Sequence, residues 1–73
     1  MKNKTESLQK KSFTLSGHRT SVALESLFWE ELQKIAQDRE ISLSKLITQI
    51  DEENQGNLAS ILRIYVLNFF RKN

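Results

Sequence analysis

The chain has 73 residues, a formal net charge of +2, no cysteine and a single histidine, His18. A chain of this length forms one domain at most and buries only roughly 60% of the surface that its unfolded form exposes. Because disulfides are absent and a metal site is poorly supported by one histidine, the composition favours support from a second subunit. The lack of cysteine fits a reducing compartment, and we expect a cytoplasmic protein.

The positive charge is concentrated near the N-terminus. Residues 1–20 carry five cations against one carboxylate, whereas the rest of the chain carries six cations against eight carboxylates. Residues 1–11 are predicted to form a flexible basic arm that precedes a single domain over residues 12–73. Such an arm suits an anionic partner, and Lys10 and Lys11 are candidate phosphate contacts. We find no secretory signal and no apolar run long enough to cross a membrane.

Residues 19–24 have the two-residue period of a strand with one face against a core. One side carries Thr20, Val22 and Leu24, and the other carries Arg19, Ser21 and Ala23. A lone strand would leave its backbone groups unpaired, so it needs a partner. Residues 12–16 could fold back onto it across a turn at 17–18, giving a small hairpin. We favour the alternative, in which the same strand of another chain pairs antiparallel with it.

Three helices are predicted downstream, over about residues 27–39, 42–52 and 57–71. Their expected N-caps are Ser26, Ser42 and Asn57, and Gly56 is expected to end the second helix. The first helix should bury Phe28, Leu32, Ile35 and Ala36, with Trp29 at the margin. The fold class is therefore mainly α with one short strand or a small hairpin. The expected core and dimer residues are Thr20, Val22, Leu24, Phe28, Leu32, Ile35, Leu46, Ile50, Ile61, Tyr65 and Phe69.

The last helix is apolar on more sides than one buried face requires. Ile64, Leu67 and Phe70 lie outside its main apolar stripe. A helix that is apolar nearly all round needs cover from several directions. A second subunit or another protein could provide that cover.

The stretch RTSVALESLFWEELQKIA followed by ISLSKLI resembles the MetJ/Arc-type ribbon-helix-helix family. The pattern GHRTSVALE with the later NLASILRIYVL is similar to a small bacterial subgroup that has a GHRTS-like strand and an extra C-terminal helix. The resemblance implies an intertwined homodimer with an intersubunit antiparallel β-ribbon. It also implies a transcriptional regulator, or an antitoxin-like autoregulator, that inserts this ribbon into the major groove of double-stranded DNA.

The resemblance further implies a role for particular residues. The outward positions Arg19, Ser21 and Ala23 would contact bases. The start of the second helix would hold a phosphate through Ser42, Leu43, Ser44 and Lys45. Four departures bear on this interpretation. Ala23 is a poor base reader, Glu40 stands where many relatives have glycine, Glu25 would repel phosphate, and the segment SFTLSGH could cover the outward face.

The alternative function is a protein-interaction module on the same dimer, which uses the apolar C-terminal helix and does not bind DNA. Catalysis is not expected, because no nucleophile is paired with a base and no glycine-rich phosphate loop is present. The acidic run DEENQGN lacks the alternating ligands of a calcium loop and is interpreted as a solvated turn. No metal, no cofactor and no membrane partner are expected.

Overall fold

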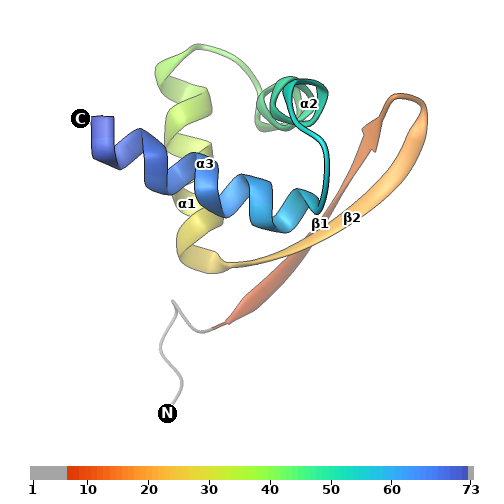
Figure 1. Cartoon of the computed structure of the whole chain (residues 1–73), viewed down its shortest axis with the longest axis horizontal. Helices are drawn as coiled ribbons and strands as arrows, with labels where there is room; N and C mark the ends of the chain where they lie inside the picture. The colour runs from red at the N-terminus through yellow and green to blue at the C-terminus, as the bar shows by residue number, and fades with distance from the viewer. Residues whose placement is uncertain (1–6, 73) are drawn as a thin grey trace.

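The structure is a computed structural model, which describes residues 7–72. Two strands, β1 (Leu8–Leu15) and β2 (His18–Glu25), precede three helices, α1 (Ser26–Asp38), α2 (Leu43–Glu53) and α3 (Leu58–Lys72). The three helices lie on one side of the β1–β2 hairpin, and its turn projects beyond α2 (Figure 1). The expected mainly α fold with a small hairpin is confirmed.

The strand predicted over residues 19–24 finds its partner within its own chain. β1 pairs antiparallel with β2, from Leu8 opposite Glu25 to Leu15 opposite His18. Ser16 and Gly17 form the turn with φ values of 52° and 80°, as two-residue type I′ loops require. The less favoured of the two alternatives, the hairpin, is therefore the observed structure, and its turn lies one residue earlier than expected.

The hairpin also moves the predicted boundary of the basic arm. Residues 8–11 belong to β1 and not to a flexible arm. The sequence does not mark these residues as a strand, because they lack alternating apolar side chains. Of the rest of that predicted arm, Ser7 is described and its carbonyl accepts the Ser26 N–H, whereas residues 1–6 lie outside the described residues.

The core lies between the inner face of the hairpin and the three helices. The hairpin contributes Phe13, Leu15, Val22 and Leu24, and the helices contribute Trp29, Leu32, Ile35, Ala36, Leu46, Ile47, Ile50, Leu62 and Val66. Phe28, Ile61, Tyr65 and Phe69 pack against this core while remaining half-buried. Thr20, another expected core position, is also half-buried. A single chain thus surrounds its own small core, with apolar side chains left at its edge.

Two of the three predicted helix caps are present. The Lys45 N–H donates to Ser42 Oγ at 3.0 Å, and the Ser60 N–H donates to Asn57 Oδ1 at 3.0 Å. Ser26 is not a cap. It is the first residue of α1, and its N–H donates to the Ser7 carbonyl at 3.0 Å. β2 runs directly into α1, so the Ser7 carbonyl, just before β1, accepts an N–H at the start of the helix. This backbone bond takes the place of a side-chain cap.

The second helix ends within one residue of its predicted bound at 52, but Gly56 is not the residue that ends it. α2 ends at Glu53, and the side-chain amide of Asn54 donates to the Ile50 carbonyl at 2.8 Å. This bond satisfies one of the carbonyls that a helix leaves free at its C-terminus. Gly56 instead lies in the following connection with a φ of 120°.

The turn between α1 and α2 uses a left-handed residue that is not glycine. Glu40 has a φ of 59°. Its N–H donates to the Gln37 carbonyl, and the Ile41 N–H donates to the Ala36 carbonyl, both at 3.0 Å. These two bonds form a Schellman motif, in which glycine is the usual left-handed residue. Glu40 therefore occupies the glycine position of the turn without changing its hydrogen bonds.

Candidate nucleic-acid interface

The hairpin has an outward face that is formed by both strands. On β2, Arg19 and Ser21 are exposed and Ala23 is half-buried. In the hairpin register these residues lie opposite Thr14, Ser12 and Lys10 of β1, which are all exposed. Since residues opposite each other in an antiparallel pair point to the same side, the six side chains share one face. We call these six residues, Lys10, Ser12, Thr14, Arg19, Ser21 and Ala23, the outward face.

The centre of the outward face is a pair of serines. Ser12 Oγ and Ser21 Oγ are 3.0 Å apart and form a cross-strand hydrogen bond. Hydroxyl groups can both donate and accept, so they suit base edges and phosphate oxygens alike. The two cations of the face, Lys10 and Arg19, lie toward opposite ends of the hairpin. The next pair on the same side, Leu8 opposite Glu25, places one carboxylate at the border of the outward face.

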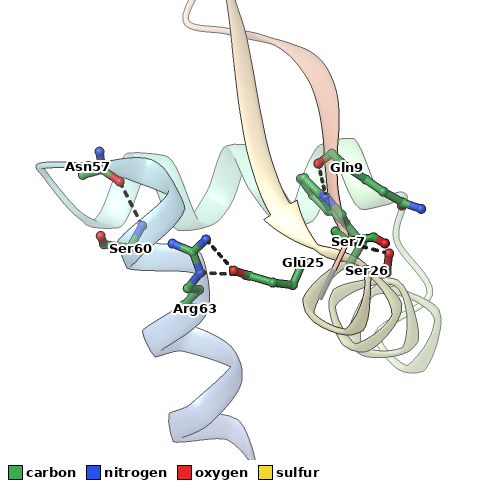
Figure 2. Close-up of polar contacts among 8 residues, drawn as sticks. Ser7, Gln9, Glu25, Ser26, Asn57, Ser60 and Arg63 are labelled. Atoms are coloured by element: carbon green, nitrogen blue, oxygen red, sulfur yellow. Dashed lines mark hydrogen bonds and ion pairs between the residues drawn. The ribbon is translucent and has the colours of Figure 1, made fainter. Parts of the chain in front are cut away.

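The bordering carboxylate of Glu25 is paired with a side chain of α3. Arg63 Nε and Nη2 donate to the two oxygens of Glu25 at 2.9 Å and 3.2 Å (Figure 2). The hydrogen bonds from Arg63 are the main cause that lowers the pKa of Glu25. Glu25 is therefore ionised at neutral pH, and its charge is balanced by the guanidinium. This pairing reduces the phosphate repulsion that the sequence suggested for Glu25.

The segment before β2 does not cover the outward face. β1 pairs edge to edge with β2 and does not fold across its outer side. Phe13 and Leu15 point into the core and are 8% and 5% exposed. Lys11 lies on the helix-facing side of β1, and its Nζ is 5.8 Å from the centroid of the Trp29 ring. The structure thus separates the two adjacent lysines, because Lys10 lies on the outward face and Lys11 does not.

Trp29 explains why β1 continues as far as Leu8. This side chain is 3% exposed, and its indole N–H donates to the Gln9 carbonyl at 2.8 Å. Its ring centroid is 5.9 Å from that of Phe13. The sequence placed Trp29 at the margin of α1 because the stripe of this helix does not show that a strand covers it.

The predicted phosphate-binding residues at the start of α2 belong to a separate element. Ser42, Ser44 and Lys45 are exposed, and Leu43 is half-buried. The hydroxyl of Ser42 already accepts the Lys45 N–H, which leaves the N–H groups of Leu43 and Ser44 at the helix start. The geometry of a helix N-terminus is present here, but these residues are not part of the outward face.

An open groove of about 570 Å³ lies beside β2. Thr20, Ser21, Val22 and Ala23 form one wall, and the other wall includes Asn57, Leu58 and Ala59 at the start of α3. One edge of β2 pairs with β1, and no strand among the described residues pairs with its other edge. A strand edge of this kind carries backbone donors and acceptors that can pair with another chain.

A second groove is apolar and lies between α1 and α3. It measures about 270 Å³ and is lined by Leu27, Phe28, Glu31, Val66, Leu67 and Phe70. Leu67 and Phe70 are 54% and 53% exposed, and the neighbouring Ile64 is 55% exposed. The predicted excess of apolar surface on the last helix is therefore present in the structure.

Across residues 7–72, no group of three or more His, Cys, Asp or Glu side chains is arranged to hold a metal ion. Within the same described range, none of the helices combines the length and apolar character needed to cross a membrane.

The comparisons with known proteins agree with the observed architecture. The profile of the Ribbon-helix-helix domain family matches residues 8–70, which include both strands and most of α3. No curated protein gives a significant match. Among solved structures, the chain is similar to an uncharacterized protein from Bordetella pertussis Tohama I, with a TM-score of 0.81 and 32% identity. The similarity covers 90% of this chain and 58% of that one, so this chain spans little more than half of its neighbour.

Proposed function

We propose, from the premise that this chain belongs to the ribbon-helix-helix domain family, that it acts as a homodimeric DNA-binding protein and transcriptional regulator. The outward face would lie in the major groove of double-stranded DNA. The observation that carries this proposal is a largely exposed hairpin face with two cations and three hydroxyl groups, whose one bordering carboxylate, Glu25, is paired with Arg63.

The dimensions of a two-stranded ribbon made from β2 of each subunit support insertion into DNA. The major groove is about 12 Å wide and admits a two-stranded β-ribbon. Alternate residues on one strand face are roughly 7 Å apart, which is close to two base-pair steps. Arg19 can donate two hydrogen bonds to a guanine edge, and Ser21 can bond to several bases. Ala23 offers only a methyl contact, so we expect Arg19 to carry most of the sequence preference.

The free edge of β2 supports the homodimer. A second copy of β2 could pair antiparallel along this edge and enter the groove between β2 and α3. Such an interface is isologous, because the same surface of each subunit faces its counterpart. The resulting ribbon would be continuous across the two subunits. This pairing is the intersubunit ribbon expected from the resemblance, now flanked by β1 of each chain.

The start of α2 would add a phosphate contact. Its free N–H groups and the positive end of the helix dipole favour an anion, and Lys45 adds a full positive charge nearby. These contacts would set the orientation of the protein on DNA without selecting a sequence.

The proposal is tested by fluorescence anisotropy of a labelled duplex titrated with the protein at several salt concentrations. We expect binding that weakens steeply with salt, because phosphate neutralisation releases counterions. Arg19→Ala should weaken binding further, whereas the matched variant Arg71→Ala, which removes a cation in the last turn of α3, should have a smaller effect. Absence of binding at low salt by a folded dimer would contradict the proposal.

A second candidate function is favoured by the apolar groove between α1 and α3. Its occupant would be an amphipathic helix of a partner protein, because the groove runs between two helices and is lined by apolar side chains, among them Phe28, Leu67 and Phe70. A double substitution of Leu67 and Phe70 by Gln should abolish capture of such a partner. The oligomeric state of the protein and its DNA affinity should remain unchanged. If the double variant loses DNA binding instead, α3 contributes to the regulator itself.

A further inference from the structure

The outward face contains a row of β1 side chains that β2 alone would lack. Lys10, Ser12 and Thr14 lie directly opposite Ala23, Ser21 and Arg19. All three β1 side chains are exposed. Lys10 faces the smallest side chain of the β2 row, so no bulky neighbour stands across from it. The β1 row is thus a second polar row, roughly 4.8 Å to one side of β2.

The width of the sheet in the proposed dimer places the β1 and β2 rows over different parts of the major groove. If the β2 edges of two subunits pair, the order of strands becomes β1, β2, partner β2 and partner β1. Three spacings of about 4.8 Å place the two outer strands roughly 14 Å apart. The major groove is about 12 Å wide. The β2 rows therefore lie over the floor of the groove, where base edges are presented, and the β1 rows lie over its rims, where the phosphates are.

We infer that the β1 row binds the sugar–phosphate walls of the major groove, with Lys10 as its charged contact and with Ser12 and Thr14 as hydroxyl donors. This inference rests on the proposed function and divides the outward face between its two strands. β1 supplies affinity that is independent of sequence, and β2 supplies sequence preference. Phosphate contacts from hydroxyl and ammonium groups fix position and register in this way.

Lys11 has no part in this row. Its side chain lies on the other side of β1 and reaches toward the Trp29 ring. Two adjacent lysines of equal charge therefore differ mainly in the face that they occupy. This difference makes Lys11 a matched control, because its removal changes the net charge of the protein by the same amount.

The test compares Lys10→Gln with Lys11→Gln by anisotropy titration on two duplexes of different sequence, over a range of salt concentrations. Lys10→Gln should weaken binding several-fold, by the same factor on both duplexes. It should also lower the slope of log affinity against log salt by about one for each subunit. Lys11→Gln should leave the slope close to that of the unmodified protein. Both lysines are exposed, so both variants should fold, and circular dichroism checks this.

The outcomes separate the inference from the function on which it rests. If the unmodified protein binds, and Arg19→Ala weakens binding, but the two lysine variants behave alike, the division between strands is wrong while the proposed function stands. If Lys10→Gln changes the preference between the duplexes, β1 reads bases, and this also overturns the inference. If the unmodified protein does not bind at low salt, the proposed function fails and the inference fails with it.

Discussion

Arg63 on α3 holds Glu25 at the end of β2 through two hydrogen bonds, although the residues are 38 positions apart in the sequence. The contact joins the last helix to the end of the hairpin, at the point where β2 continues into α1. Arg63 also lies over the Phe28 ring, with 6.0 Å between its guanidinium carbon and the ring centroid. The third helix therefore supports the hairpin electrostatically, in addition to contributing Leu62 and Val66 to the shared core.

The ion pair predicts that stability depends on pH. Because the hydrogen bonds from Arg63 lower the pKa of Glu25 in the folded protein, the pair stabilises the fold above the unfolded pKa of about 4.3. This contribution is lost as the pH falls through the lowered folded pKa. Glu25→Gln should reduce the urea midpoint at pH 7 and have much less effect in strong acid. The size should be modest because both side chains are about one-third exposed.

The control for this prediction is Glu52→Gln, which removes an exposed carboxylate from α2. The urea midpoints of the unmodified protein and of the two variants are measured by unfolding followed through Trp29 fluorescence. If Glu25→Gln and Glu52→Gln change the midpoint equally at pH 7, the Arg63 contact does not stabilise the fold.

The turn after α1 predicts a stabilising substitution. Glu40 has a positive φ, which costs an L-residue roughly 1 kcal/mol, whereas glycine adopts this conformation freely. Glu40→Gly should therefore raise the free energy of unfolding by up to about 1 kcal/mol, since greater freedom of the unfolded chain offsets part of the gain. Glu40→Ala keeps the Cβ atom and should bring no such gain. Equal stabilities of the two variants in urea unfolding would show that the turn is not strained.

The indole of Trp29 predicts a destabilising substitution. Trp29→Phe retains an aromatic ring but removes the N–H that donates to the Gln9 carbonyl. The lost bond and the smaller ring together should cost about 1–3 kcal/mol. Circular dichroism during urea unfolding measures this, because the variant has no tryptophan. An unchanged midpoint would mean that β1 is not held by this contact.

The hydroxyl of Tyr65 predicts the opposite outcome for a similar change. Among the described residues, the Tyr65 hydroxyl is the one buried side-chain oxygen or nitrogen that has no hydrogen-bond partner. Removing an unpaired buried hydroxyl relieves its desolvation cost. Tyr65→Phe should therefore leave stability unchanged or raise it by up to about 1 kcal/mol. A thermal unfolding midpoint clearly below that of the unmodified protein would indicate that a bound water satisfies the hydroxyl.

Alternation and helix periodicity predicted the elements whose apolar side chains repeat regularly. Val22 and Leu24 marked β2, and Ser42 and Asn57 marked the starts of α2 and α3. The extent of β1 could not be predicted in the same way. Gln9 and Lys11 lie on its inner side without being apolar, and the strand is held there by backbone pairing and by the Trp29 indole.

The sequence predicted the β2 half of the outward face but not the β1 half. The period of β2 identifies which of its residues share the outward face, because alternate side chains point to the same side. The contribution of Ser12 and Thr14 depends on the register between two strands, and a single strand does not reveal that register.

The most direct test of the central claim is to map amide chemical shifts of the labelled protein while a DNA duplex is added at low salt. We predict that the shifted signals cluster at residues 10–14 and 19–23 on the hairpin and at the start of α2, while those of Leu67 and Phe70 remain in place. Shifts confined to α3, or no shifts while the protein stays folded, would contradict a DNA-binding role for the outward face.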